Sequence, residues 1–299
     1  MSDLRTRYMG IELKNPIIAG ASELSSDMEK IKKIENAGAG AIVIKSLFEE
    51  QIQLETYKFD EEWSKYDELH AEMITVHPDV EHAGPAEHLM WVRKAKEAVK
   101  IPVIASLNAV NKETWIEYSK KLEETGVDGL ELNFYAVPTD FEKTGDQIEQ
   151  EQIDILKEIK KNISIPVSVK LSSFYSNPLH FISKVDKAGV NGFVLFNRFF
   201  QPDINVTREA NTFPFNLSQR KDHRLPLRFA GLLYNNIKGD VCASTGIMQG
   251  EDVIKMILAG ADCVQVVSTL YKNKIGQITK ILDDVKEWMD HKGDRKSTR

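Results

Sequence analysis

The segment "AGVNGFVLFN" (residues 188–197) decides the fold, because its pattern recurs along the chain. Related segments are "AGAGAIVIKS" (37–46), "TGVDGLELNF" (125–134) and "AGADCVQVVS" (259–268). In each, a glycine closes an amphipathic helical pattern, and a short turn leads into an apolar run. Glycine readily adopts the left-handed conformation that ends a helix, and runs that are apolar on both faces predict parallel strands covered by helices. The repeat therefore predicts successive helix–turn–strand units.

Extending this search over the whole chain gives eight strand-like runs, each followed by a helical pattern. They span residues 16–21, 41–46, 102–108, 129–134, 166–172, 192–197, 240–245 and 263–269. Eight such units predict one (β/α)₈ TIM barrel domain over residues 1–299. A doubly wound open sheet is the alternative, and the lack of a GxGxxG motif after the first strand disfavours a dinucleotide-binding form of it.

Two connections are longer than the others, residues 47–84 after the second strand and 198–215 after the sixth. Both would lie at the carboxyl ends of the strands, where barrel enzymes build their active sites. The first connection is rich in histidines, but the spacing of His70, His77, His82 and His88 is irregular for metal binding. We therefore expect no metal site.

Composition excludes several classes of protein. The net charge is -6, with 39 basic and 45 acidic residues and no basic stripe, which argues against nucleic-acid binding. Cys242 and Cys263 lie in apolar runs without metal-binding spacing. No apolar run approaches the roughly 20 residues of a membrane span, and no signal-peptide core is present. These features predict a cytoplasmic protein without membrane contact.

Polar residues lie at or just beyond the carboxyl end of nearly every predicted strand. They are Ser22, Lys45, Ser46, Ser106, Asn108, Asn133, Lys170, Ser172, Asn197, Ser244, Thr245, Ser268 and Thr269. The carboxyl ends of barrel strands meet at one mouth, so these side chains should converge there. Such convergence predicts a binding site.

Lys45 and Lys170 interrupt apolar strands, and a buried ammonium needs an anionic or hydrogen-bonding partner. One interpretation is a Schiff-base lysine, and the other is a pair of cations that hold a cofactor or an anionic substrate. Small and hydroxylated residues after the last two strands favour phosphate binding. FMN lying across the mouth fits this pattern, and a sugar-phosphate substrate is the alternative.

Several of these motifs together resemble the dihydroorotate dehydrogenase family, in particular its soluble class 1 branch. They include "NPIIAGAS" (15–22), "GLELN" (129–133), "VSVKL" (167–171), "FVLFN" (193–197), "STGI" (244–247) and "AGADCVQVVSTL" (259–270). The resemblance covers nearly the whole chain. It implies an FMN-dependent homodimeric oxidoreductase that converts dihydroorotate to orotate in pyrimidine biosynthesis.

The resemblance also assigns residue roles. The predicted cofactor-binding residues are Ala19, Gly20, Ala21, Ser22, Lys45, Ser46, Asn108, Asn133, Lys170, Asn197, Ser244, Thr245, Gly246, Ser268 and Thr269. Of these, Thr245, Gly246, Ser268 and Thr269 would hold the phosphate. The predicted substrate-binding residues are Asn133, Asn197 and Arg198, with a carboxylate as the group that Arg198 would bind. Lys45, Asn133 and Tyr135 are the predicted catalytic residues.

One departure from the family bears on activity. Class 1 enzymes carry a cysteine base three residues after the asparagine of the fourth strand, where this chain has Ala136. Alanine cannot accept a proton, and Tyr135 and Thr139 are the candidate replacements. Three hypotheses follow: a dihydroorotate dehydrogenase-like enzyme, an FMN barrel inactive on dihydroorotate with another substrate or an electron-transfer role, and a phosphate-binding lyase using Lys45 or Lys170.

Overall fold

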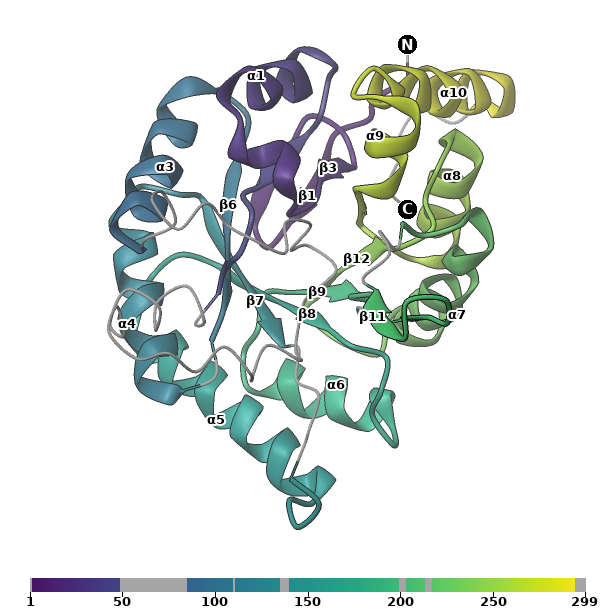
Figure 1. Cartoon of the computed structure of the whole chain (residues 1–299). Helices are drawn as coiled ribbons and strands as arrows, with labels where there is room; N and C mark the ends of the chain where they lie inside the picture. Colours follow the sequence, from purple (N-terminus) through teal and green to yellow (C-terminus); the bar gives the residue numbers. More distant parts are fainter. Residues whose placement is uncertain are drawn as a thin grey trace.

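The computed structural model describes residues 2–48, 85–109, 111–134, 140–198, 203–212 and 217–293. A ring of parallel strands forms its centre, and helices surround this ring (Figure 1). The predicted long connection at 47–84 falls almost entirely outside the described residues. Within the second, β10 (Asp203–Asn205) and β11 (Ala210–Thr212) form an antiparallel hairpin.

Eight parallel strands follow one another around the barrel in chain order. They are β3 (Ile17–Ala19), β4 (Ala41–Val43), β6 (Val103–Asn108), β7 (Gly129–Phe134), β8 (Val167–Leu171), β9 (Gly192–Leu195), β12 (Asp240–Ser244) and β13 (Cys263–Val266). Pairing of β13 with β3 and of β4 with β6 closes the ring. The short β5 (Leu47–Phe48) also pairs with β6. The predicted (β/α)₈ barrel is confirmed, and the open sheet is excluded because no edge is left between β3 and β13.

Helices cover the outside of the barrel. Described helices are η1 (Glu23–Ser26), α1 (Met28–Asn36), α3 (Pro85–Ala98), α4 (Lys112–Glu123), α5 (Gly145–Asn162), α6 (Pro178–Lys187), η4 (Arg220–His223), α7 (Arg224–Leu233), α8 (Gly250–Ala259), α9 (Ser268–Asn273) and α10 (Gln277–Lys292). The strand predicted over 263–269 ends earlier, at Val266, because Ser268 and Thr269 begin α9. No described helix is both long and apolar enough to cross a membrane.

The glycines of the repeat stop their helices as predicted. Gly38, Gly126, Gly189 and Gly260 have φ angles of +102°, +84°, +90° and +109°. Two residues beyond Gly126, Gly189 and Gly260, a side-chain oxygen accepts a hydrogen bond from the start of the preceding strand. The pairs are Asp128 with the Val103 N–H (2.7 Å), Asn191 with Val167 (3.0 Å) and Asp262 with Val241 (2.7 Å). We call each such pair a strand clamp.

The barrel interior changes character along its axis. At the amino-terminal end, the hairpin of β1 (Thr6–Tyr8) and β2 (Ile11–Leu13) closes the barrel, and its Tyr8 packs in an apolar layer with Cys242 and Cys263. Gly192 makes room for this plug, since a β-carbon there would lie 2.8 Å from the Tyr8 ring. Nearer the carboxyl end, the inward-facing residues are polar. A polar layer therefore lies between the apolar plug and the mouth.

Candidate functional site

A pocket opens at the carboxyl ends of the strands and encloses about 680 Å³, part of it open to solvent. Its lining includes the following predicted residues: Ala21, Ser22, Lys170, Asn197, Arg198, Ser244, Thr245, Gly246 and Ser268. Strands β8, β12 and β13 contribute to it, as do the segments that follow β3 and β9. Six of the polar strand-end residues therefore meet at this cavity: Ser22, Lys170, Asn197, Ser244, Thr245 and Ser268.

The floor of the pocket contains Lys170 of β8 and Gln265 of β13. Behind them lies Glu131 of β7, whose side chain is fully buried. Its Oε1 lies 3.9 Å from Lys170 Nζ, and its Oε2 accepts a 2.5 Å hydrogen bond from Gln265 Nε2. Glu131 thus provides the anionic partner that a buried lysine requires.

Amide and guanidinium groups follow β9. Asn197 Nδ2 donates to Asn133 Oδ1 at 2.8 Å, which joins the ends of β9 and β7. Asn133 is buried, and its own Nδ2 has no hydrogen-bond partner among the described residues. Arg198 Nη1 donates to Asp222 Oδ2 at 2.5 Å. The Asn133 amide therefore has a donor to offer a ligand.

The turn after β12 has an unusual backbone. Thr245 and Gly246 have φ angles of +76° and +77°, and a left-handed β-branched residue carries strain of about 1–3 kcal/mol. The Thr245 hydroxyl donates to the Phe196 carbonyl at 2.9 Å. A β-carbon at Gly246 would lie 2.3 Å from the His223 nitrogen, so only glycine lets η4 pack here.

Ser218 closes the same end of the pocket. Its hydroxyl accepts from the Gly246 N–H at 3.1 Å, and its own N–H donates to Ser268 Oγ at 3.0 Å. Lys272 Nζ donates to the Ser218 carbonyl at 2.8 Å. N–H and hydroxyl groups and the exposed Lys272 ammonium therefore gather where phosphate binding was predicted.

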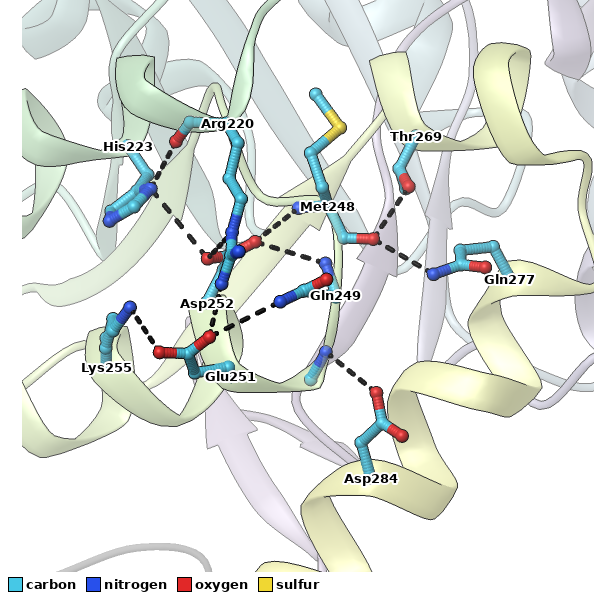
Figure 2. Close-up of polar contacts among 11 residues, drawn as sticks. Arg220, His223, Met248, Gln249, Glu251, Asp252, Lys255, Thr269, Gln277 and Asp284 are labelled. Carbon is cyan, nitrogen blue, oxygen red and sulfur yellow. Dashed lines mark hydrogen bonds and ion pairs between the residues drawn. The ribbon is translucent and has the colours of Figure 1, made fainter.

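A network of polar contacts supports this turn from behind (Figure 2). The fully buried Asp252 accepts from the Met248 N–H at 3.0 Å and from Arg220 Nε at 3.2 Å. His223 Nδ1 lies 3.8 Å from the same carboxylate. Nearby on the surface, Lys255 and Arg220 lower the pKa of Glu251 to about 2. Asp252 thus ties η4 to the start of α8.

The remaining described residues of the predicted cofactor set do not line the pocket. Thr269 is buried and donates to the Met248 carbonyl at 2.9 Å, which supports the turn rather than facing the cavity. Ser46 and Ser106 share a 2.7 Å hydrogen bond. The others are Ala19, Gly20, Lys45, Asn108 and Asn133, all at or near the carboxyl ends of strands.

Lys45 forms an ion pair with Glu23 beside the mouth. His88 of α3 lies close enough to feel this charge, and burial together with Lys45 lowers the pKa of its imidazole to about 4. His88 is therefore neutral at pH 7. Among the described residues, no group of histidine, cysteine and acidic side chains is arranged to hold a metal ion.

Tyr135, Ala136, Pro138 and Thr139 lie outside the described residues, as do His70, His77 and His82. The predictions that involve these residues stay predictions. Three polar residues of the pocket were not predicted from the sequence: Ser218, Gln265 and Tyr271. A glutamine inside the apolar run "CVQVV" was a usable signal, whereas nothing in the local sequence marks Ser218.

FMN fits the chemistry of this site. Hydroxyl and N–H groups of Ser244, Thr245, Gly246 and Ser268 gather at one end, and Lys170 at the floor supplies a cation. Between them, the buried Gln265 Oε1 has no hydrogen-bond partner among the described residues. A phosphorylated ring compound with polar edges would complement these groups.

The fold and the pocket define a parallel (β/α)₈ barrel with a ligand site at the carboxyl ends of its strands. A family model described as "Dihydroorotate dehydrogenase" matches residues 80–289. The match covers more than half of the chain, so this chain belongs to the dihydroorotate dehydrogenase family.

Curated relatives agree over almost the whole length. The chain is 29% identical to the "Dihydroorotate dehydrogenase B (NAD(+)), catalytic subunit" of Methanocaldococcus jannaschii, over 94% of this chain and 92% of that protein. It is 28% identical to the protein of the same name from Thermoplasma volcanium, over 97% of this chain and 94% of that protein. It is 26% identical to the "Putative dihydroorotate dehydrogenase A (fumarate)" of Aeropyrum pernix, over 88% of this chain and 85% of that protein.

Proposed function

We propose that this protein binds FMN across the barrel mouth and is an oxidoreductase of the dihydroorotate dehydrogenase type. The observation that carries the proposal is the pocket, because nine residues assigned to cofactor or substrate line it together. Family membership supports the same conclusion. The flavin would supply the hydride acceptor, and the chain would supply binding, orientation and proton transfer.

The residues divide this work by position. Ser244, Thr245, Gly246 and Ser268 would bind the phosphate through N–H and hydroxyl groups. Ala21 and Ser22 line the pocket and would lie beside the ring, and Lys170 would donate to its pyrimidine side. Glu131 Oε1 lies 3.9 Å from Lys170 Nζ, so this carboxylate would position the ammonium.

Substrate binding falls to Asn133, Asn197 and Arg198, with a carboxylate held by the Arg198 guanidinium. Lys45 acts at the reactive edge. Because position 136 is alanine, proton removal from dihydroorotate depends on a replacement such as Tyr135. A positioned base contributes roughly 10²–10⁴-fold, so we expect slow oxidation of dihydroorotate and propose that the physiological substrate differs from it.

The lyase alternative is weaker in this structure. A Schiff base requires a neutral amine, and a carboxylate partner favours the ammonium form. Both candidate lysines have such partners, Glu23 for Lys45 and Glu131 for Lys170. The structure therefore favours FMN binding over a Schiff-base lyase.

Flavin titration tests the proposal. The purified protein, saturated with FMN and freed of excess ligand, should retain a yellow flavin spectrum, and failure to bind FMN would rule out both flavin hypotheses. Anaerobic mixing with dihydroorotate should bleach the flavin slowly. Ala136→Cys should bleach it roughly 10²–10⁴-fold faster, with Ala136→Val as the matched control. Equal rates for all three proteins would contradict the role given to position 136.

The family resemblance also supports a cytoplasmic homodimer. Sedimentation of the FMN-saturated protein measures its mass in solution. A mass of about 34 kDa at micromolar concentration would be that of a monomer and would contradict the homodimer.

A further inference from the structure

The polar layer beneath the pocket contains a buried acceptor without a partner. Gln265 is 1% exposed, and its Nε2 donates to Glu131 Oε2. A carboxylate accepts hydrogen bonds and donates none, so the amide nitrogen faces Glu131 and the amide oxygen faces away from it. This oxygen, Oε1, has no hydrogen-bond partner among the described residues.

Oε1 lies beside Gly20, in the segment that follows β3. A β-carbon at position 20 would lie 3.2 Å from Oε1, and glycine leaves that space open. Gln265 itself lines the cavity, together with Lys170 from β8. A buried carbonyl that makes no hydrogen bond is costly. A ligand with an N–H or O–H group at this point would remove that cost on binding.

Glu131 organises two different groups at once. It holds the Lys170 ammonium, which is 6% exposed, through Oε1 and the Gln265 amide through Oε2. The floor therefore presents a fixed donor, Lys170 Nζ, and a fixed acceptor, Gln265 Oε1. Such a pair complements a ligand edge that carries an acceptor and a donor.

We propose that Gln265 is a further cofactor-binding residue, whose Oε1 accepts a hydrogen bond from FMN, and that Glu131 is the positioning residue that orients Gln265 and Lys170. The inference rests on the proposed binding of FMN. Two parts of FMN carry suitable donors, the imide N–H of the ring and the hydroxyls of the ribityl chain. The chemistry they share is a hydrogen bond donated to a buried amide oxygen.

Flavin affinities of the full-length apoprotein test this proposal without any measurement of turnover. FMN, N3-methyl-FMN and 2′-deoxy-FMN are titrated, and quenching of flavin fluorescence gives each Kd. Gln265→Met keeps the volume and removes the acceptor, so it should weaken FMN binding about tenfold. The analogue that lacks the donor facing Oε1 should bind the wild type and Gln265→Met equally. That analogue identifies the ring imide or the ribityl chain as the source.

The control is Ser168→Ala, which changes another buried polar residue of the barrel interior outside the pocket lining. It should leave all three affinities unchanged. Glu131→Gln can donate as well as accept, so the Gln265 amide is free to turn, and discrimination between FMN and the analogue should fall. If this variant does not fold, Glu131→Asp replaces it, because the shorter side chain withdraws the acceptor and should have the same effect.

Three results would overturn the inference. One is an unchanged FMN affinity in Gln265→Met, and another is an equal loss for all three flavins, which would indicate altered packing. Undiminished discrimination in the Glu131 variant would remove the positioning role. A wild-type protein that binds no flavin would overturn the proposed function and this inference together, whereas FMN binding independent of Gln265 would overturn the inference alone.

Discussion

At the scale of single residues, Asp252 makes several of the hydrogen bonds that support the pocket turn. Its carboxylate is fully buried at the start of α8, where it accepts from backbone N–H groups of Met248 and Gln249 and from Arg220 (Figure 2). Acidic groups near a helix N-terminus are stabilised by the helix dipole. The turn that contributes Thr245 and Gly246 to the pocket runs directly into this network.

Asp252→Asn should therefore lower the free energy of unfolding by about 1–3 kcal/mol, because the hydrogen bond from the Arg220 guanidinium to a buried carboxylate is lost. Urea unfolding measures the change. Glu251→Gln is the matched control, since Glu251 is the neighbouring acid with a 57% exposed side chain, and it should unfold as the wild type does. Equal stability of the two variants would contradict the role given to Asp252.

Individual site residues were predictable only in part. Ser244, Thr245 and Ser268 were found because they lie at or just beyond the ends of apolar strands, which are visible in the sequence. Ser218 was not found, because its partner Ser268 is 50 residues away. Whether a strand-end side chain faces the pocket also depends on its partners: Thr269, which donates to the Met248 carbonyl, does not line it.

At the scale of elements, the strand clamps explain how each repeat unit is attached to the one before it. Asp128, Asn191 and Asp262 occupy the same position after their stop glycines, and each bonds the start of the preceding strand. Their backbone N–H groups return bonds to the same residues, for example Asp262 to the Val241 carbonyl at 2.8 Å. The clamps lie at the end of the barrel opposite the pocket, where residues of such barrels serve stability rather than catalysis.

The clamp at Asp262 should have a distinctive pH dependence. Burial raises the pKa of Asp262 to about 6, with Asp240 adding to the effect and the Val241 N–H opposing it. Between pH 4 and 6 the folded state therefore keeps a proton that the unfolded state releases, so this contribution to stability is lost as pH rises. Asp262→Asn stays neutral and still accepts from Val241. Its stability relative to the wild type should increase between pH 4 and 7, by up to about 3 kcal/mol.

Unfolding in urea at several pH values measures this difference. Asp128→Asn is the matched control, because Asp128 makes the same clamp and also pairs with Lys96 at 2.6 Å. The stability of Asp128→Asn relative to the wild type should not increase in the same way as the pH rises. Parallel pH profiles for the two variants would show that burial of Asp262 is not the cause.

At the scale of the whole molecule, the barrel separates an apolar end from a polar one. Cys242 and Cys263 lie opposite each other on β12 and β13 in the apolar layer, and neither is exposed. Burial raises the pKa of both thiols, and each thiol also feels the other. Low thiolate content and lack of access both suppress reactivity.

Ellman's reagent should therefore find no reactive thiol in the folded protein and two in urea. Phe174→Cys places a thiol at a 73% exposed position and serves as the positive control. Its added thiol should react at once under native conditions. Rapid reaction of the wild-type protein would show that the apolar end of the barrel opens readily.

The sequence by itself determined the eight strands, the glycine helix stops and the convergence of polar residues at one mouth, because periodicity and backbone preference act over a few residues. Tertiary structure alone decided which of those residues line the pocket. It also joined Glu131 to Gln265 across 134 residues of chain. Such contacts depend on closure of the barrel and on the stagger of its strands, and the local sequence encodes neither of these.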